Sequence, residues 1–512
     1  MLLRKVPWLV SLRFVGMIGG DELAAAALAS TLCNVTGLSL SVGLSSALTT
    51  LAGQARGHLW RQRQLQQESD AETWEKEQSV NDKTSICSDD EPGEVQEAVS
   101  FLQSGGTTIS SSQKLVMPLV FLYRGMFIQL LLIIPVGLWW LYGIEPLLIQ
   151  LGQGANLSSM TQDYLRILTP SLWAYSINWT LASWLQSMEM ADIPAYAAMV
   201  SLAAHVPLNY LFIYGLNWGY LGCAAATSAS QMLQPVVILA YLQTTNGQSR
   251  LWHEMGATGS SNFKESFLPI VGLAISKGIR QYLALAVPGI VIISEWWASE
   301  IAIFLAGRLD NASVTLGAMT LYQSINTACF MFPVAFSVAG ATRVSTWLGA
   351  GQAGAASQSS SVSIISAGAL SALMGIVLYV TPHTFFPSLF APTETELYEQ
   401  AGKLMPLLAL YVFADGIQSA LNGVVKGCGR QALIMPVVVV AYWVVGLPLA
   451  YHWAFDEQCS SLCGDLGLVS GMTTGTWVHM LLLAAVVLCG TDWIKEAKKA
   501  HARMVSAENE DE

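Results

Sequence analysis

Two glutamates lie inside an apolar stretch that is long enough to cross a membrane. Residues 288–309, PGIVIISEWWASEIAIFLAGRL, contain Glu295 and Glu300. A carboxylate at membrane depth costs on the order of 2.5–3.5 kcal/mol on insertion scales, so it is rarely left facing lipid. On a helix the two side chains are about 140° apart around the axis and about 7.5 Å apart along it. One can bind an ion or a substrate in a central cavity while the other faces a neighbouring helix. The alternative is a hydrogen-bonded pair of acids that holds helices together.

The composition of the whole chain indicates the environment of this stretch. Of 512 residues, 53% are hydrophobic and 12% are charged, and the mean hydropathy is +0.47, whereas soluble domains are about 25% charged. In lipid the backbone must satisfy its own hydrogen bonds, and the alternating segments of a membrane barrel are absent. The sequence therefore predicts an all-α, polytopic membrane protein.

The acidic net charge comes mostly from one segment. Residues 59–112 hold 11 acids and 4 bases, which sums to −7 and leaves −4 of the total of −11. This segment is rich in Gln, Ser and Glu and poor in aromatic residues, so we expect a disordered, acidic insertion. Nothing in the sequence indicates a nucleic-acid partner.

Hydropathy predicts about twelve membrane spans, which form two sets of six. They run near 5–19, 24–52, 115–142, 163–187, 191–216, 220–243, 281–307, 312–341, 358–382, 402–425, 431–454 and 466–490. The first is short and is interrupted by Arg13, so we expect a truncated first helix.

The positions of Lys and Arg predict that both ends of the chain are cytoplasmic, because basic residues concentrate in cytoplasmic loops. The expected organisation is helices 1–2 of a first lobe at 1–58, the cytoplasmic insertion at 59–112 and helices 3–6 at 113–250. A cytoplasmic linker follows at 251–280, then helices 7–12 of a second lobe at 281–492 and a cytoplasmic tail at 493–512.

The two halves of the chain repeat. With an offset of 292 residues, GLSSALTTLAGQARG at 43–57 aligns with AFSVAGATRVSTWLG at 335–349. Two six-helix halves related by an axis along the membrane normal are a transporter architecture, with a cavity between the halves.

Several longer blocks carry a family resemblance. They are GDELAAAALASTLCNVTGLSLSVGLSSALTTLAGQARG (20–57), EWWASE (295–300), PVAFSVAGATRVSTWLGAG (333–351), DGIQSALNGVVKGCGRQ (415–431) and YWVVGLP (442–448). In order and spacing these blocks resemble the eukaryotic multidrug and toxic compound extrusion (MATE) transporters, over nearly the whole chain apart from 59–112 and the start of helix one. The resemblance implies two six-helix lobes around a V-shaped cavity, and export of organic cations or metabolites against protons or Na⁺.

The resemblance also implies roles for particular residues. Glu295 and Glu300 match two family acids of the seventh helix, and Asp415 matches the acid of the tenth. Gln323 stands where animal members have a glutamate, and Thr49 stands where plant-type relatives have an acid. Two titratable groups of the family are therefore absent.

The polar residues at membrane depth agree with this assignment. Those of the first half are mostly uncharged, whereas Asp415, Asn422 and Lys426 recur at i, i+7 and i+11 of the tenth span and form one stripe. A proton carrier must change charge, so we expect coupling in the second half. We assign Glu295 and Asp415 to proton or cation binding, with Glu300 as a partner or second site.

The remaining polar and aromatic residues at membrane depth are expected to line the cavity. They are Gln323, Asn326, Gln418, Asn422, Trp296, Tyr322 and Asn178. Trp296, Trp297 and Tyr322 could stack on aromatic or cationic substrates, or serve only in helix packing. We predict no metal site and no cofactor.

These features predict a secondary active antiporter that exports organic cations, xenobiotics or metabolites in exchange for protons or Na⁺ by alternating access. An enzyme is not expected: no GxxxxGK[ST] phosphate loop occurs, and the histidines show no metal-ligand spacing. The alternative is a lipid-linked flippase of related architecture, which would favour a basic cavity. We expect a monomer in contact with membrane lipid, in a plasma or vacuolar-type membrane. Cys459 and Cys463 could form a disulfide or remain free.

Overall fold

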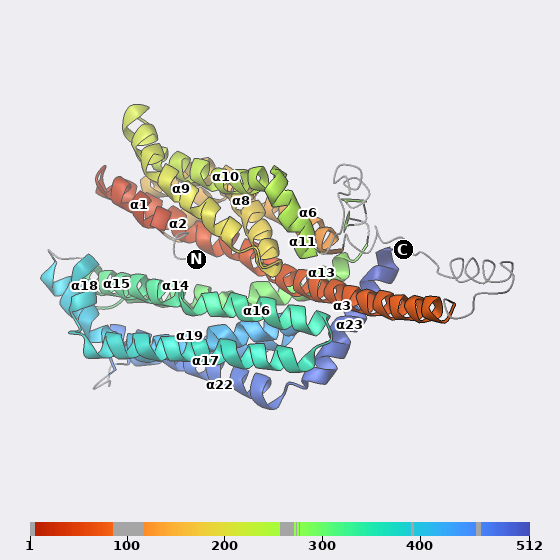
Figure 1. The fold of residues 1–512 in the computed structure, drawn as a ribbon. Coiled ribbons are helices and arrows are strands. Elements are labelled where there is room, and N and C mark those ends of the chain that lie inside the picture. The colour runs from red at the N-terminus through yellow and green to blue at the C-terminus, as the bar shows by residue number, and fades with distance from the viewer. Residues whose placement is uncertain are drawn as a thin grey trace.

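The described part of the chain folds into two bundles of helices (Figure 1). The structure is a computed structural model, and it describes residues 6–84, 117–255, 277–390, 394–456 and 462–511, together with residues 271, 272, 274 and 275. Those residues contain no strand. The prediction of an all-α, multi-pass fold in two lobes is confirmed.

The first lobe is built from the first half of the chain. Its elements are α1 (Val6–Gly16), α2 (Gly20–Cys33), the π-helical η2 (Asn34–Leu38), α3 (Ser39–Thr84), α6 (Met117–Tyr142), α7 (Ile144–Gln150), α8 (Ala155–Ser187), α9 (Asp192–Tyr210), η3 (Leu211–Gly215), α10 (Tyr220–Gln243) and α11 (Thr245–Met255).

The second lobe is built from the second half. Its elements are α13 (Ile279–Ile292), α14 (Ser294–Ala306), α15 (Ala312–Phe330), α16 (Pro333–Gly349), α17 (Ala353–Val380), α18 (Phe385–Phe390), α19 (Thr395–Cys428), α20 (Gln431–Val438), η4 (Val439–Gly446), α21 (Leu447–Phe455), α22 (Asp465–Ala484), η5 (Ala485–Cys489) and α23 (Trp493–Asp511). The side of the molecule that carries α23 is called the α23 end below.

Ten helices of the described residues are long and apolar enough to cross a membrane. The predicted spans 5–19 and 163–187 are not among them. α1 has 11 residues, whereas a span needs about 20. α8 has 33 residues, but Ser176, Asn178 and Thr180 make its middle polar. All three are buried, because α8 packs against α2, α3, α6 and α10. Enclosure by neighbouring helices allows α8 to carry polar residues at this depth.

The insertion differs from its expected disorder over its first half. α3 continues without a break to Thr84, so residues 59–84 are helical. This stretch contains no Gly or Pro and is rich in Gln, Glu, Lys and Arg, which have high helix propensity. Residues 85–112 lie outside the described residues. In the predicted cysteine pair Cys463 is disulfide-bonded, and Cys459 is also outside the described part.

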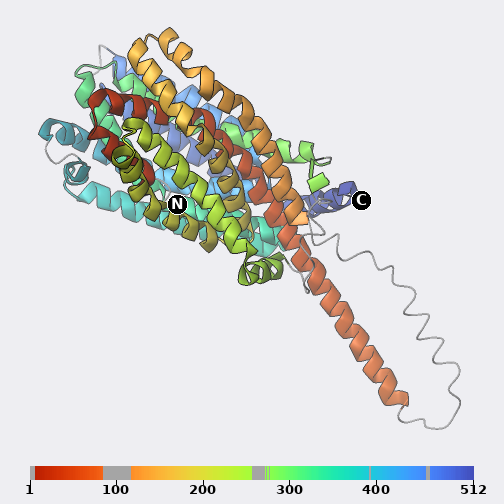
Figure 2. The same ribbon diagram turned by 90° about the horizontal axis from the view of Figure 1, so that it is seen from above.

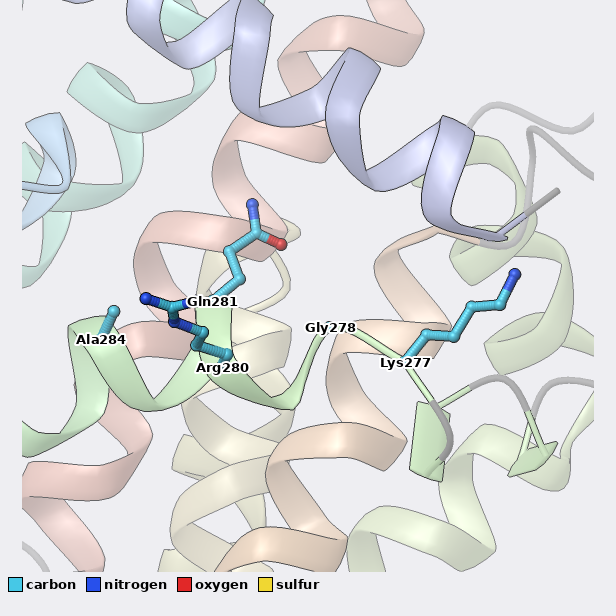
Figure 3. A pocket seen from close by; sticks show the side chains of 5 residues that line it. All are labelled: Lys277, Gly278, Arg280, Gln281 and Ala284. Carbon is cyan, nitrogen blue, oxygen red and sulfur yellow. The ribbon is translucent and has the colours of Figure 1, made fainter.

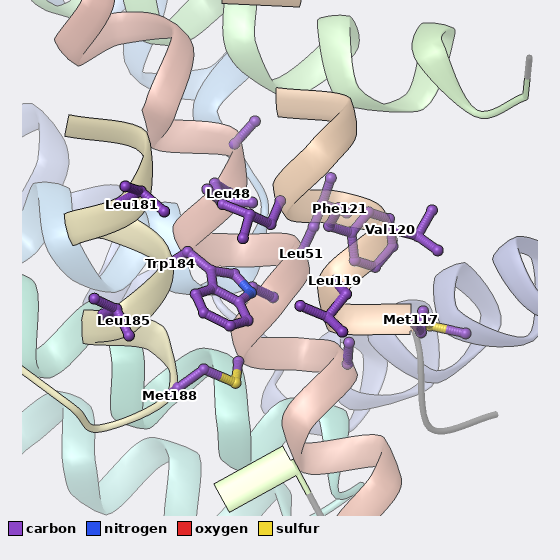
Figure 4. Packing of buried hydrophobic residues seen from close by; sticks show 14 of the residues in the cluster. Leu48, Leu51, Met117, Leu119, Val120, Phe121, Leu181, Trp184, Leu185 and Met188 are labelled. Carbon is purple, nitrogen blue, oxygen red and sulfur yellow. The ribbon is translucent and has the colours of Figure 1, made fainter. Parts of the chain in front are cut away.

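Each lobe has its own hydrophobic core. In the first lobe Trp184 packs among Leu48, Leu51 and Leu181 (Figure 4), and its indole Nε1 donates to the Pro118 carbonyl at 2.9 Å. A separate cluster fills the second lobe between α14, α19, η4 and α22. Packing within each lobe therefore holds the helices that carry polar residues in fixed positions.

Helix α13 connects the two cores. It precedes the other helices of the second lobe in sequence, but Tyr282, Leu285 and Ala286 belong to the first lobe's core. The Tyr282 hydroxyl donates to the Leu44 carbonyl of α3 at 3.0 Å. α13 also packs against α20 of the second lobe. The boundary between the lobes therefore passes through the seventh predicted span.

The two repeated segments contact each other where the lobes meet. A Cβ added at Gly57 of α3 would lie 1.8 Å from the Thr346 carbonyl oxygen, and one added at Gly349 of α16 would lie 2.1 Å from the Gln54 carbonyl oxygen. Gly57 and Gly349 are equivalent positions of the repeat. This contact between equivalent elements agrees with an axis that runs between the lobes.

Candidate functional site

Glu295 lies in the first turn of α14, and an amide from a second helix holds its carboxylate. Ile293 is the single residue between the end of α13 and the start of α14. Gln418 of α19 donates from Nε2 to Glu295 Oε2 at 2.9 Å, and Gln418 Oε1 accepts from the Tyr442 hydroxyl at 3.3 Å. A hydrogen bond to a charged group contributes about 1.5–3 kcal/mol. The amide therefore fixes the position of the Glu295 carboxylate.

A π-helical segment brings two further side chains to this site. Tyr442 and Trp443 both belong to η4, and π-helical turns are frequent at functional sites. The Tyr442 hydroxyl lies 3.2 Å from Thr476 Oγ1 of α22. The Trp443 indole donates to Ser294 Oγ at 3.1 Å, directly beside Glu295. Helices α14, α19, η4 and α22 therefore converge on one carboxylate.

A histidine of α22 faces the same carboxylate. His479 is fully buried, and its Nδ1 lies 3.5 Å from Glu295 Oε2. Its ring stands perpendicular to that of Tyr442, with centroids 5.5 Å apart and an interplanar angle of 89°. Within the described ranges neither ring nitrogen has a hydrogen-bond partner. His479 and Glu295 are thus within ion-pair distance, but the geometry at Nδ1 and Oε2 is not that of a hydrogen bond.

Asp415 lies on α19, one turn before Gln418, and is 7% exposed. Because Gln418 bonds to Glu295, both acids lie near the same part of α19. The rings of Tyr322 and Tyr411 meet edge to face, with centroids 6.5 Å apart, and both tyrosines interact electrostatically with Asp415. The same two tyrosines and Gln323 line a cavity of about 20 Å³, which is enough for one water molecule.

Several polar atoms buried in the second lobe have no partner in the described part of the chain. They include Asn326 Oδ1, Ser371 Oγ, Asn422 Oδ1 and Ser470 Oγ. An unsatisfied buried polar group costs about 1–3 kcal/mol, and such groups in native proteins usually bind water or an ion. The interior of the second lobe is therefore suited to hydration or to ion binding.

The polar centre of the first lobe is different in character. Gln129 of α6 accepts hydrogen bonds on Oε1 from Ser45 at 3.0 Å and from Thr180 at 2.7 Å. Its amide nitrogen donates to the Ser41 carbonyl at 3.3 Å. These groups are neutral and use one another as partners. They join α3, α6 and α8, and they offer no charge change to a transported ion.

Of the residues predicted for the site, Asn178 lies in the first lobe, away from Glu295 and Asp415, and two residues of α14 are partly or largely exposed. Asn178 is 2% exposed inside the first lobe, where its amide donates to Gln234 Oε1 at 2.9 Å. Trp296 is 41% exposed. Glu300 is partly exposed, farther along α14. The structure brings together Glu295, Asp415 and Gln418, and Tyr322 and Gln323 line the small cavity together with Tyr411.

Sequence reasoning missed His479 and Tyr442 as members of the site. His479 is 184 residues from Glu295, and spacing along the chain does not relate α22 to α14. Tyr442 is one of several aromatic residues in an apolar run, without a neighbouring charge. The one available signal was a histidine at the middle of a predicted span, where a titratable group is rare.

A second cavity lies far from the acids. Its volume is about 510 Å³ and its lining includes Lys277, Arg280 and Gln281 (Figure 3). Fifteen residues of α13 and α14 separate Arg280 from Glu295, which corresponds to at most about 22 Å along the two helices. The two basic side chains make this cavity unsuitable for a cation, so we place the candidate cation site at Glu295 and Asp415.

Comparisons with known proteins agree with this architecture. The MatE family model matches residues 4–63, 112–211 and 288–452. The chain is 28% identical to Protein DETOXIFICATION 12 of Arabidopsis thaliana over 503 residues, covering 98% of this chain and 88% of that protein. It is 26% identical to Protein DETOXIFICATION 36 of the same plant over 492 residues, covering 96% and 82%.

Solved structures show the same fold. The crystal structure of the eukaryotic MATE transporter AtDTX14 matches with a TM-score of 0.75 and 27% identity, covering 98% of this chain and 95% of that chain. The crystal structure of a point mutant of the Vibrio cholerae MATE transporter VcmN matches with a TM-score of 0.70 at 16% identity, covering 96% and 95%.

Two lobes of membrane helices, one of them with carboxylates in its interior, define a polytopic membrane transporter. The family match extends over more than half of the chain. The chain belongs to the MatE family, and it is a membrane efflux transporter of small molecules.

Proposed function

We propose that the chain is an antiporter that exports organic cations or other xenobiotics and metabolites in exchange for protons, or for Na⁺. The observation that carries the proposal is the pair of acids in the second lobe. Glu295 is bonded to Gln418 of α19, and Asp415 lies one turn earlier on the same helix, 7% exposed; other buried polar atoms of the second lobe have no partner in the described residues. The neutral centre around Gln129 in the first lobe cannot exchange a proton for a cation.

The chemistry of exchange follows from the acids themselves. Burial favours the neutral form of a carboxylate, whereas a bound cation favours the ionised form. A proton and a cationic substrate therefore compete for the same group. Competition of this kind is reciprocal, because each ligand lowers the affinity of the site for the other by the same factor.

The arrangement of the lobes supports alternating access. At the α23 end, Thr50 of α3 donates to the Lys426 carbonyl at 2.6 Å, and Gln54 donates to the Gly427 carbonyl at 3.2 Å. These bonds join the first lobe to α19 of the second. The positive-inside rule places this end in the cytoplasm, so we infer that the structure is closed on the cytoplasmic side. Opening there requires these bonds to break.

The test is transport by the purified full-length protein in proteoliposomes with an acidic interior. We expect uptake of ethidium, a fluorescent organic cation, to follow the proton gradient. Asp415→Asn and Glu295→Gln remove the titratable groups and should each lower gradient-driven uptake at least tenfold. Asp163→Asn is the matched control, because Asp163 lies on the surface of the first lobe, where its side chain is 45% exposed.

The outcomes separate the alternatives. Wild-type rates in both acid variants would overturn the assignment of these residues. Uptake that follows an imposed Na⁺ gradient and ignores the proton gradient would make Na⁺ the coupling ion. Movement of a fluorescent lipid between leaflets without ethidium uptake would favour the flippase. Monomeric function and a plasma or vacuolar-type membrane location remain expectations.

A further inference from the structure

We propose that His479 is a proton-binding residue of the transport site, and that it holds the exchanged proton jointly with Glu295. The proposal rests on the antiport function proposed above and deepens it. His479 Nδ1 lies 3.5 Å from Glu295 Oε2, and the imidazole is fully buried. Sequence reasoning and the family match assign no role to this residue.

The polar group that faces the imidazole is the Glu295 carboxylate, 3.5 Å from Nδ1. Neither ring nitrogen has a hydrogen-bond partner among the described residues, so Nδ1 has this carboxylate as its available partner. An imidazolium beside the Glu295 carboxylate converts Nδ1–H into a charge-assisted bond after a shortening of about half an ångström. The carboxylate is thus the group in the described structure that satisfies this nitrogen.

The neighbouring side chains hold the pair in this geometry. Gln418 donates to the same oxygen, Glu295 Oε2, at 2.9 Å. The Tyr442 ring stands against the imidazole at 89°, and its hydroxyl reaches both Gln418 and Thr476. Neither the glutamate nor the histidine can rotate away without breaking these contacts. The pair is therefore built into the packing of α14, α19, η4 and α22.

Other titratable groups around the pair set its charge balance. Glu295 faces His479 from α14, and Tyr442 faces it from η4. From α19, Asp415 and Lys426 both interact electrostatically with Glu295, and Tyr411 does so as well. α20 has no titratable residue, and Tyr451 and His452 of α21 are exposed.

The exchange step conserves charge at the site. With the proton bound, Glu295 is ionised and His479 is an imidazolium. A monovalent organic cation binds to the Glu295 carboxylate, the N–H bond of the imidazolium breaks, and the proton passes to water. One positive charge replaces another, and the histidine becomes neutral. This step requires no second acid, and it leaves Asp415 available for a further proton.

The experiment measures ethidium binding to the purified full-length protein in detergent, without transport. Fluorescence titrations at pH values between about 5 and 8 cover the range in which imidazole titrates. Competition between one proton and one ethidium predicts that the dissociation constant rises about tenfold per unit fall in pH over the competing range. A pH-indicator dye in weak buffer reports the protons released per ethidium bound.

Three variants decide the role of the histidine. His479→Gln and His479→Phe should flatten the pH dependence of ethidium binding and remove most of the proton release, and His479→Phe keeps a ring against Tyr442. His205→Gln is the matched control, because His205 is 0% exposed and is bonded to Ser11 and Ser230 within the first lobe. Its pH dependence should equal that of the wild type.

The possible results are distinct. A wild-type slope and proton count in folded His479→Gln or His479→Phe protein would overturn the proposal, while the antiport function would stand. Wild-type binding without pH dependence or proton release would overturn both. If both His479 variants fail to fold, Glu295→Gln provides the second measurement. If Glu295 and His479 hold the proton jointly, the pH dependence of ethidium binding should be flatter in Glu295→Gln than in the wild type. An unchanged pH dependence would contradict the proposal.

Discussion

Gln418 is the residue that connects the acid of α14 to the rest of the second lobe. Its amide nitrogen donates to Glu295, and its amide oxygen accepts from Tyr442. Thr476 already donates to the Met472 carbonyl at 3.1 Å, so its oxygen can accept from Tyr442. If Glu295 becomes protonated, its O–H can donate to the Gln418 amide oxygen once the Gln418 amide has flipped. The Tyr442 hydroxyl then donates to Thr476 and accepts from the Gln418 amide nitrogen. The network has a complete set of donors and acceptors in both states.

We predict that Gln418→Leu lowers both stability and coupled transport. The substitution leaves Glu295 without its amide donor and Tyr442 without an acceptor in Gln418, which should cost about 1–3 kcal/mol of unfolding free energy. Thermal unfolding and gradient-driven ethidium uptake measure the two effects. Gln400→Leu is the control, because Gln400 also joins α19 to a carboxylate of α22, Asp465, at 2.7 Å.

The Gln400→Leu control should lose stability but keep gradient-driven uptake, because its contact lies about 27 Å along α19 from Gln418. Equal loss of uptake in the two variants would mean that Gln418 serves only to pack the helices.

At the residue scale, the sequence singles out side chains that are rare at membrane depth, but it does not show which side chains they contact. Glu295 and Asp415 stand out because acids are seldom placed at membrane depth, and Gln418 shares a helix with Asp415. The bond between Gln418 and Glu295 joins positions 123 residues apart, and no periodicity encodes it. The proximity of His479 to Glu295 follows from the packing of α22 against α14, which the sequence does not show.

At the scale of elements, hydropathy predicted most helices to within a few residues, because lipid imposes both length and composition. Hydropathy also predicted a span at 163–187, where α8 lies. The polar middle of α8 keeps this helix out of the ten apolar spans. The helical extension of α3 was missed because disorder and an exposed helix share a charged, polar composition. The π-helical segments were not predicted either, because their apolar residues follow no pattern that distinguishes them from the α-helices around them.

The close contact between α3 and α16 leads to a prediction at the same scale. Gly57→Ala would place a Cβ 1.8 Å from the Thr346 carbonyl oxygen, so the two helices must move apart. Overpacking of this kind costs about 1–3 kcal/mol, and we expect a lower unfolding temperature for the purified protein. Gly354→Ala is the control, because a Cβ there meets nothing within 4 Å. If the two variants unfold at the same temperature, the helices do not meet at this glycine.

At the scale of the whole molecule, α23 holds the two lobes together. Ala497 and Ala500 pack in a core cluster of the second lobe, whereas Met504 and Ala507 pack in that of the first. Between these two faces Arg503 donates to Gln54 of α3 at 3.0 Å and to the Cys428 carbonyl of α19 at 3.2 Å. Figure 1 shows α23 crossing the ends of both bundles.

We predict that Arg503→Ala loosens the α23 end. The variant loses the bonds from Arg503 to Gln54 of α3 and to the Cys428 carbonyl of α19, so Cys428, which is 2% exposed, should react severalfold faster with a maleimide. Peptide mass spectrometry locates the modified cysteine. Lys498→Ala is the control, because Lys498 is exposed on the same helix. An equal rate of Cys428 modification in wild type and Arg503→Ala would show that α23 does not keep the lobes closed.

The extension of α3 has a mechanical consequence. Arg61 donates to the Ala350 carbonyl at 3.0 Å, and beyond it α3 runs away from both bundles (Figure 2). From Gly57 to Thr84 the helix is about 40 Å long. Because it is continuous with a membrane helix, it acts as a lever arm, and a rotation of α3 by about 10° would move its tip by about 7 Å. A small rocking motion of the lobes would thereby produce a displacement at this tip that a pair of fluorophores can measure.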